Sequence, residues 1–331
     1  MKLIIQIPCF NEETLLPFAL RGLPPQIEGI DEIETLVVDD GSTDGTVQVA
    51  HQCGVNHIVE LGTHRGLGAA FSAGLEACLQ LGADVIVNTD ADNQYRGEDI
   101  FLLLQPILEG RADLVVGVRD ISSIEHFSWT KKWLQQLGSW VVRKASHCSI
   151  EDTTSGFRAF NQEGALRTMV YSRFSYTLET IIQAGYNQLR VATVPVRVNE
   201  KLRESRLAGS TWEYLKKSTA TIVRIYAMYN PLKVFSFIGG MVFIPGVLLG
   251  IRYLYFYLEV GASGHVQSLI LSAILLIVGF QIMVIGLLSD LISAHRRLSE
   301  DIYYRVRKLE LDREPTGAIA GGNGTKRTIT E

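Results

Sequence analysis

From Lys2 to about Val118 the chain alternates short apolar runs with segments of helical character. The apolar runs predict strands at Lys2–Ile7, Glu34–Val38, His57–Glu60, Val85–Asn88 and Leu114–Val118. Helices are predicted between them, near Glu12–Arg21, Gly45–Cys53, Gly68–Leu81 and Ile100–Leu108. Continuous apolar strands that alternate with helices are typical of a mostly parallel sheet with both faces covered. The pattern therefore predicts an α/β, Rossmann-like domain.

The pattern is less regular between residues 120 and 200. It predicts a helix at Lys131–Ser146, a polar turn at Glu151–Gly156, a helix near Tyr176–Ala184 and a strand at Arg190–Val198. No internal repeat or low-complexity tract is found before the tail.

Two uncharged runs follow, at Val234–Ile251 and Val266–Ser289. About 20 helical residues cross the apolar core of a bilayer, so each run is long enough to span one. The short Glu259–His265 link predicts a transmembrane helical hairpin. Arg252 lies near a helix end, from which its side chain can reach the headgroups, and the tyrosines of Tyr253–Tyr257 suit the membrane interface. Two buried helices of a soluble core are the alternative.

Positive charge flanks the hairpin at its two outer ends. The flanking residues are Lys216, Lys217, Arg224, Lys233, Arg296, Arg297, Arg305, Arg307 and Lys308, and the link carries neither lysine nor arginine. By the positive-inside rule, we expect the domain that precedes the hairpin and both termini in the cytoplasm. Mixed apolar and basic residues predict interfacial helices on both sides of the hairpin. The expected order is a domain at 1–210, a juxtamembrane helix at 211–232, two spans within 233–292, an amphipathic helix at 293–311 and a disordered tail at 312–331.

Composition narrows the function classes. The formal net charge of the 331 residues is −4, whereas nucleic-acid binders usually carry a basic excess. The four cysteines have no CxxC spacing and no histidines at zinc spacing, so we expect reduced thiols in a cytosolic domain. The apolar start of the chain is interrupted by Gln6 and followed at once by Asn11 and Glu12, which favours a buried strand over a signal peptide.

Polar clusters fall at the carboxyl ends of the predicted strands, where ligands bind in such sheets. The most informative cluster is Asp90-Ala91-Asp92, which follows the strand at Val85–Asn88. Alternate residues of an extended segment share a face, so the two carboxylates can hold a divalent cation that also bridges a diphosphate. A bare Asp-x-Asp is more often two solvated turn residues. Its position among other polar strand ends favours the metal site here.

A second cluster, Asp39-Asp40-Gly41-Ser42-Thr43-Asp44-Gly45, ends the strand at Glu34–Val38. Its aspartates can accept hydrogen bonds from a base or a ribose, its glycines permit tight turns and its polar residues can cap the next helix. Gly66-Leu67-Gly68 opens a helix and can approach a phosphate through backbone N–H groups, although close helix packing is an equal alternative. The dinucleotide fingerprint GxGxxG is absent from the sequence.

Four ordered motifs resemble the family 2 glycosyltransferases. They are Ile7-Pro8-Cys9-Phe10-Asn11-Glu12-Glu13, Val38 to Thr46, Asp90-Ala91-Asp92-Asn93-Gln94 and Thr154-Ser155-Gly156-Phe157-Arg158. The sequence is most similar to the dolichyl- and undecaprenyl-phosphate sugar transferases, a branch that includes dolichol-phosphate mannose synthase and the bactoprenol glucosyltransferases. The motifs cover about residues 1–210, and the hairpin is similar to that of the bacterial members.

The resemblance implies a nucleotide-diphospho-sugar transferase fold, inversion at the sugar carbon and a Mg²⁺ or Mn²⁺ cofactor. By motif, the base and ribose pocket would comprise Pro8, Phe10, Glu12, Val38 and Asp40. The residues expected to contact the diphosphate and the metal are Asp90, Ala91, Asp92 and Gln94, with Asp90 and Asp92 as metal ligands. Arg119 matches a family arginine near the phosphates. Asp152 matches an aspartate beside the reacting centre, and it is assigned a catalytic role together with Asp92.

The chain departs from the family at residues 200–206. Many relatives carry Arg-x-x-Gly-x-Ser-Lys there, whereas this chain has Arg203 where glycine is usual and Arg206 where lysine is usual. Positive charge is kept, so Arg203, Ser205 and Arg206 are expected to bind the acceptor phosphate. A solvated basic loop is the alternative. The departure bears on the identity of donor and acceptor more than on the class of reaction.

Together the sequence predicts a membrane enzyme that moves one sugar from a UDP- or GDP-linked donor to a polyprenyl phosphate at the cytoplasmic face. Its expected partners are the donor, the lipid acceptor, membrane lipid and possible further copies of itself, with no nucleic acid. A processive polysaccharide synthase is one alternative, but the Gln-x-x-Arg-Trp motif of those enzymes is absent. A membrane scaffold with a degenerate nucleotide-binding domain is another, against which Asp90 and Asp92 argue.

Overall fold

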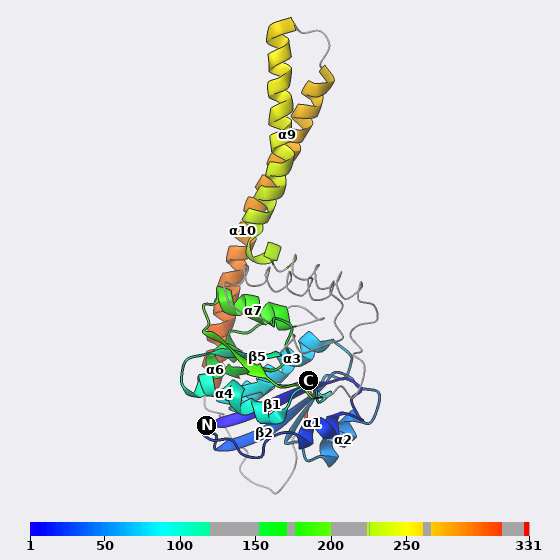
Figure 1. Cartoon of the computed structure of the whole chain (residues 1–331), viewed down its shortest axis with the longest axis vertical. Coiled ribbons are helices and arrows are strands. Elements are labelled where there is room, and N and C mark those ends of the chain that lie inside the picture. Colours follow the sequence, from blue (N-terminus) through cyan, green and yellow to red (C-terminus); the bar gives the residue numbers. More distant parts are fainter. Residues whose placement is uncertain are drawn as a thin grey trace. The chain divides into compact units, whose positions relative to one another are not determined.

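The computed structural model describes residues 1–119, 152–170, 176–199, 224, 226–260, 266–312 and 328–330 (Figure 1). The chain divides into two compact units. The first comprises residues 1–215 together with 304–331, and the second comprises residues 216–303. The expected helix at Lys131–Ser146, the segment 200–206 and most of the juxtamembrane helix lie outside the described residues.

The first unit is built on one eight-stranded sheet. Its strands are β1 (Lys2–Cys9), β2 (Glu32–Asp39), β3 (His57–Glu60), β4 (Val85–Asn88), β5 (Leu114–Arg119), β6 (Arg158–Asn161), β7 (Val191–Val196) and β8 (Thr328–Thr330). Their spatial order is β7-β5-β6-β4-β1-β2-β3-β8. β6 is antiparallel to both of its neighbours, and the remaining pairs are parallel. The predicted fold class, a mostly parallel α/β sheet, is confirmed.

The direction of β6 matters for function. Because β6 runs against β4 and β5, its amino end lies at the edge of the sheet where the neighbouring strands have their carboxyl ends. The segment Asp152–Phe157, which immediately precedes β6, is thereby brought to that edge. The sequence predicted only a polar turn here and no strand after it.

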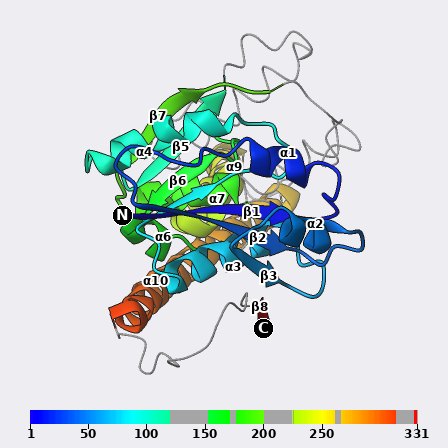
Figure 2. The ribbon, with the colours of Figure 1, turned by 90° about the horizontal axis from the view of Figure 1, so that it is seen from below.

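Helices cover both faces of the sheet (Figure 2). One face packs against α1 (Leu16–Arg21), α2 (Thr46–Gln52) and α4 (Ile100–Leu108), the last preceded by the short η1 (Gly97–Asp99). The other packs against α3 (Leu67–Gln80), α6 (Gln162–Leu166) and α7 (Thr177–Tyr186). Side chains of β1 alternate between the two cores, which is why a strand buried on both faces is almost entirely apolar, with Gln6 as the exception.

The second unit contains two long helices, α9 (Pro231–Val260) and α10 (Val266–Asp312). By length and composition, both are apolar enough to cross a membrane. They pack closely where glycines leave room: a Cβ on Gly279 would lie 2.8 Å from Phe243, and one on Gly286 would lie 2.7 Å from the Cβ of Phe235. The hairpin was predicted, but its second helix runs without interruption through the segment expected to form a separate amphipathic helix.

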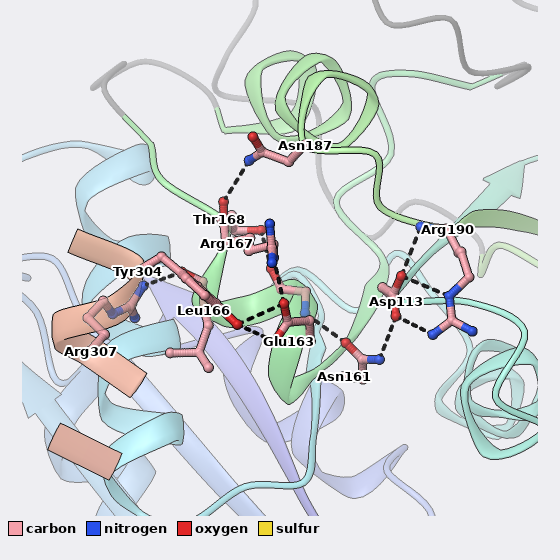
Figure 3. A network of polar contacts seen from close by, with 11 residues as sticks. Asp113, Asn161, Glu163, Leu166, Arg167, Thr168, Asn187, Arg190, Tyr304 and Arg307 are labelled. Carbon is pink, nitrogen blue, oxygen red and sulfur yellow. Dashed lines mark hydrogen bonds and ion pairs between the residues drawn. The ribbon is translucent and has the colours of Figure 1, made fainter. Parts of the chain in front are cut away.

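The last turns of α10 belong to the first unit. The Tyr304 hydroxyl donates to the Glu163 carboxylate at 2.8 Å, and the Tyr304 ring lies 4.4 Å from the guanidinium carbon of Arg167 (Figure 3). Arg307 pairs with Glu76 at 2.5 Å and donates to the Leu166 carbonyl. These contacts explain why residues from Tyr304 onward group with the first unit rather than with the second.

Two other expectations differ from the structure. The first helix begins at Leu16 rather than near Glu12, because the Glu12 and Glu13 N–H groups donate to the side chains of Thr46 and Asp44, between β2 and α2. Within the tail expected to be disordered, Thr328–Thr330 forms β8 beside β3. Two threonines and an isoleucine have high strand propensity, and β3 offers them an open edge.

Candidate active site

The loops that follow β1 and β2 are bonded to each other. The Asn11 side chain accepts a hydrogen bond from the Thr43 N–H at 2.7 Å, and the Asn11 N–H donates to the Ser42 hydroxyl at 2.9 Å. Asn11 has a positive φ of 54°, a conformation that asparagine tolerates better than most residues. These contacts hold the Pro8–Glu12 segment against the Asp39–Thr46 turn. Two motifs that lie far apart in the sequence thus form one surface.

Asp40 connects this surface to the loop after β3. Its carboxylate is buried and accepts hydrogen bonds from the Arg65 N–H at 2.7 Å and the Gly66 N–H at 2.8 Å. The His64 Nδ1 lies 2.9 Å from the same carboxylate, and the His64 ring stacks on Phe10 with centroids 4.0 Å apart. Both oxygens of Asp40 therefore organise the loop. Its predicted role in binding a base or ribose stays a prediction.

The remaining nucleotide-side residues differ in exposure. Pro8 and Val38 are buried within β1 and β2, whereas Phe10 is exposed and Glu12 partly so. Gly41, with a φ of 72°, lies against the next loop, because a Cβ there would be 2.6 Å from the Thr63 carbonyl carbon. Glycine is required at this point both for the backbone conformation and for the close approach.

Asp90 and Asp92 follow β4, as predicted. Burial and the charge of Asp92 raise the pKa of Asp90 to about 7. Asp92 accepts a hydrogen bond from the Gln94 N–H at 3.1 Å, which bends the segment back. Ala91, which lies between the two aspartates in sequence, is buried. The surroundings of Asp90 therefore disfavour its ionised form.

This pair suits a divalent cation. Carboxylate oxygens are the ligands preferred by Mg²⁺, and Mg²⁺ is commonly held by one or two of them together with phosphate oxygens. Bound positive charge would remove the repulsion that raises the pKa of Asp90. The described residues contain no group of three or more histidine, cysteine, aspartate or glutamate side chains arranged for a metal. Among the described residues the protein thus supplies a carboxylate pair here, and phosphate oxygens or water would fill the remaining positions around an ion.

Gly156 closes one side of the Asp90 site. A Cβ at this position would lie 2.8 Å from Asp90 Oδ1 and 2.8 Å from the Tyr176 hydroxyl. The Gly156 carbonyl accepts hydrogen bonds from the Asn88 side chain at 2.8 Å and from the Tyr176 hydroxyl at 3.2 Å. The glycine of the Thr-Ser-Gly-Phe-Arg motif is therefore needed for close packing against the carboxylate.

Arg119, which is partly buried, and Asp152, which is fully buried, form an ion pair beside this site. Arg119 donates from Nε to Asp152 Oδ2 at 2.7 Å and from Nη2 to Oδ1 at 3.2 Å, and Thr154 donates its N–H and hydroxyl to the same Oδ1. Burial would raise the pKa of Asp152, but Arg119 and Thr154 outweigh burial, and the pKa lies below its usual range. Asp152 is therefore an ionised side chain whose oxygens are engaged, an arrangement suited to orienting Arg119.

Sequence reasoning missed the residues beneath the site. Arg158 is fully buried and donates from Nε to the Ser155 carbonyl at 2.9 Å, and its guanidinium carbon lies 5.7 Å from the Tyr176 ring. Tyr176 in turn stacks on Phe71 with centroids 3.9 Å apart and accepts a hydrogen bond from Asn88. The only sequence signal was the arginine at the end of the fourth motif. Arg203, Ser205 and Arg206 lie outside the described residues.

Comparison with known proteins agrees with this geometry. Residues 4–168 match the family described as glycosyl transferase family 2, and residues 230–295 match the GtrB C-terminal hairpin. The two matched segments correspond to the sheet domain with its carboxylate pair and to the two long apolar helices.

Curated relatives align over most of their own length. An undecaprenyl-phosphate mannosyltransferase of Micrococcus luteus is 29% identical over 63% of this chain and 88% of its own. A polyprenol monophosphomannose synthase of Mycolicibacterium smegmatis is 28% identical over 63% and 82%. An undecaprenyl-phosphate 4-deoxy-4-formamido-L-arabinose transferase of Proteus mirabilis is 25% identical, and the alignment covers 92% of both chains, hairpin included.

Solved structures agree on the fold. Glucosyl-3-phosphoglycerate synthase of Mycobacterium tuberculosis, in a complex with Mn²⁺, UDP-glucose and phosphoglyceric acid, superposes with a TM-score of 0.54 at 20% identity, over 68% of this chain and 80% of that one. The same enzyme with Mg²⁺ and UDP gives a TM-score of 0.52 at 19% identity, over 68% and 79%. The chain is a family 2 glycosyltransferase with a GtrB-type C-terminal hairpin.

Proposed function

We propose that this enzyme transfers one sugar, with inversion, from a UDP- or GDP-linked donor to a polyprenyl phosphate at the cytoplasmic face of a membrane. The observation that carries the proposal is the combination of the Asp90–Asp92 pair with a hairpin of two membrane-length helices in one chain. Relatives named for undecaprenyl- and polyprenyl-phosphate acceptors align with this chain, one of them through the hairpin. A donor site on an enzyme held at a membrane suits a lipid acceptor.

The donor would bind along the carboxyl edge of the sheet. Phe10, Glu12 and Asp40 would surround the base and ribose, with Pro8 and Val38 shaping the floor. Asp90 and Asp92 would hold Mg²⁺ or Mn²⁺, with Ala91 and Gln94 beside the diphosphate. The ion would neutralise charge on the leaving nucleoside diphosphate. The chain's own contribution is a partly buried carboxylate pair, with Gly156 packed against Asp90.

Arg119 would stabilise charge near the reacting phosphates, and Asp152 would hold it in place. A polyprenyl phosphate is already ionised at neutral pH, so its oxygen needs little help from a base. The larger demand is electrostatic stabilisation, which fixed positive groups provide. The ion pair with Arg119 and the lowered pKa of Asp152 favour this positioning role over proton abstraction.

The acceptor phosphate would be bound by Arg203, Ser205 and Arg206, as the resemblance implies. Arginine forks suit phosphate oxygens. A charge-assisted hydrogen bond contributes on the order of 1.5–3 kcal/mol, so replacing either arginine with alanine should lower turnover roughly ten- to a hundredfold. Calorimetry of nucleotide binding to Arg206→Ala distinguishes the substrates: a large loss of affinity would assign the residue to the donor.

Orientation follows from the charges that flank the hairpin. We expect the catalytic domain and both termini to be cytoplasmic. A Thr325→Cys variant in intact cells should resist a membrane-impermeant thiol reagent and react after permeabilisation. Labelling from outside would contradict this orientation.

Turnover by the purified enzyme tests the function itself. A panel of UDP- and GDP-sugars with polyprenyl phosphate and Mn²⁺ should yield a lipid carrying one sugar, detected by mass spectrometry. Several sugars on each lipid would indicate the processive alternative. Nucleotide binding with no product from any donor would favour the scaffold.

A further inference from the structure

The residues that follow β7 run beside the segment that follows the Asp90–Asp92 pair. Val198 forms an antiparallel bridge with Tyr95. One residue further on, the Asn199 N–H donates to the Gln94 carbonyl at 2.8 Å. The backbone beyond β7 is therefore joined directly to the turn that carries Asp92, although the two segments lie far apart in the sequence.

Asn199 donates to three consecutive carbonyls of this turn. Besides the backbone bond to Gln94, its carboxamide Nδ2 lies 3.0 Å from the Asn93 carbonyl oxygen and 3.3 Å from that of Tyr95. A backbone carbonyl that is withdrawn from water needs a donor, and one side chain provides it here for the carbonyls on both sides of Gln94. The conformation of the turn therefore depends on the Asn199 carboxamide.

The peptide that joins Asn93 to Gln94 connects Asn199 with Asp92. Its carbonyl accepts the hydrogen bond from Asn199, and its N–H donates to Asp92 Oδ1 at 3.1 Å. Because the peptide is planar, fixing its carbonyl also fixes the direction of its N–H. Asn93 has a φ of 58°, a left-handed conformation that carries a cost even for asparagine, so the turn needs such support. Asn199 thus acts on the Asp92 carboxylate through one rigid unit.

Both ends of this arrangement are anchored independently. On the β7 side, Arg197 donates to the Asp99 carboxylate from its N–H at 2.6 Å and from Nε at 3.0 Å, and Asp99 is 1% exposed. On the other side, the Tyr95 hydroxyl accepts a hydrogen bond from the Gly156 N–H at 3.3 Å. Removing the carboxamide of Asn199 should therefore release the peptide before Gln94 while the surrounding segments stay in place.

We propose that Asn199 is a positioning residue for the metal site. Its carboxamide holds the peptide between Asn93 and Gln94, and this peptide orients the Asp92 carboxylate for Mg²⁺ or Mn²⁺. The inference rests on the proposed function, because it requires that Asp92 binds the ion. Hydrogen bonds behind a metal ligand fix its orientation, and their loss weakens metal binding.

Calorimetric binding of UDP, or of GDP if UDP does not bind, to the purified full chain at a series of Mn²⁺ concentrations tests the assignment. Asn199→Leu has a similar size but donates no side-chain hydrogen bond. It should raise the Mn²⁺ concentration that gives half of the gain in nucleotide affinity roughly tenfold, the lower end of the effect of losing a partner behind a metal ligand. Nucleotide affinity in EDTA should stay unchanged, because the contacts to base and ribose are not altered.

Asn187→Leu is the matched control. The Asn187 carboxamide also donates to a backbone carbonyl, that of Arg167 at 3.3 Å, but it lies at the end of α7 and has no bond to the turn that carries Asp92. Its Mn²⁺ dependence should equal that of the unaltered enzyme. Thermal unfolding in detergent reports the stability of both variants. If Asn199→Leu loses stability and keeps the Mn²⁺ dependence of the unaltered enzyme, Asn199 is only structural and the proposal is overturned.

Asn199→Ser provides a milder variant. Its hydroxyl can donate to one of the two carbonyls, so its Mn²⁺ dependence should lie between that of the unaltered enzyme and that of Asn199→Leu. If Asn199→Leu does not fold, an unchanged Mn²⁺ dependence in Asn199→Ser overturns the proposal. Absence of any Mn²⁺ effect in the unaltered enzyme has a different meaning: it would refute the metal site of the proposed function, and the role of Asn199 with it.

Discussion

The two halves of the active-site edge use aspartates in opposite ways. At the β2 end, Asp40 is buried and both its oxygens accept backbone N–H groups from the loop after β3. At the β4 end, Asp90 faces the charge of Asp92, and its pKa is raised to about 7. The hydrogen bonds to Asp40 compensate its burial. Asp90 accepts none among the described contacts, and the charges of Arg119 and Arg158 offset its burial only in part.

This difference distinguishes an aspartate that stabilises the structure of the site from one that is suited to binding a metal ion. A buried carboxylate that accepts backbone hydrogen bonds stabilises the loops that shape a pocket. A carboxylate held in an unfavourable environment favours a bound cation, at some cost to the stability of the metal-free protein. Replacing residues in the two halves should therefore have opposite signatures: turnover is lost at β4, and stability is lost at β2.

The largest effect is expected at the β4 end. Asp92→Ala should lower turnover on the order of a thousandfold, because a metal supplies several kcal/mol of stabilisation to the transition state. The variant should still fold and insert, since Asp92 makes one intrachain hydrogen bond among the described contacts, to the Gln94 N–H. Turnover and thermal unfolding of the purified variant measure both. Near-normal turnover at saturating Mn²⁺ would refute the assignment.

The Arg119–Asp152 pair should act as a unit. Asp152→Asn and Arg119→Lys are each expected to reduce turnover roughly ten- to a hundredfold, and the double variant should be little worse than either, since contacting residues are not additive. Because the pKa of Asp152 is lowered, the carboxyl stays ionised at every pH above the usual aspartate pKa of about 4. Protonation of Asp152 should therefore cause no loss of turnover above about pH 4. An acid limb near neutral pH that disappears in Asp152→Asn would instead indicate a general base.

Gly156→Ala should have a smaller effect on the same half. The added methyl meets Asp90 Oδ1 at 2.8 Å and must displace it, so we expect about a tenfold loss of turnover with weaker Mn²⁺ activation. Gly22→Ala is a suitable control, because its φ is −77° and its Cβ would lie 3.5 Å or more from every neighbour. Equal turnover in both variants would show that the position of Asp90 is not critical.

At the β2 end, Asp40→Asn should act on stability. Two backbone N–H groups lose an ionised acceptor, which should cost about 1–3 kcal/mol in the free energy of unfolding. Denaturant unfolding of the purified variant measures this loss. Unchanged stability together with lost nucleotide binding would make Asp40 a ligand contact only.

Asp113, at the opposite edge of the sheet, should show the smallest effect (Figure 3). It accepts hydrogen bonds from the Arg190 guanidinium and N–H and from Asn161, and the bonds from Arg190 chiefly lower its pKa to about 2. A lowered carboxyl pKa stabilises the fold above the unfolded value of about 4, and this stabilisation fades as pH falls toward 2. Asp113→Asn should therefore lower the melting temperature by a few degrees at pH 7, with the gap narrowing below pH 4. A gap independent of pH would exclude the ion pair as its cause.

The sequence predicted the features that depend on local pattern. Apolar runs gave the five parallel strands before residue 120, and the aspartates after β4 pointed to the carboxylate pair. β6 was missed because it has only four residues and begins with a charged one, Arg158. Asn88 donates a hydrogen bond to Tyr176, which is 88 positions away, and no spacing in the sequence predicts such a contact. The continuous α10 was predicted as two helices, because its composition changes while its helical geometry does not.

The most direct test of the account is calorimetric binding of a nucleoside diphosphate, UDP and then GDP, with Mn²⁺ and with EDTA. If Asp90 and Asp92 hold the ion that bridges the diphosphate, Mn²⁺ should raise the affinity of the unaltered enzyme roughly tenfold or more, about 1.4 kcal/mol. In the Asp90→Asn, Asp92→Ala double variant, Mn²⁺ should change the affinity little. An undiminished effect of Mn²⁺ in that variant would contradict the assignment of the metal to this carboxylate pair.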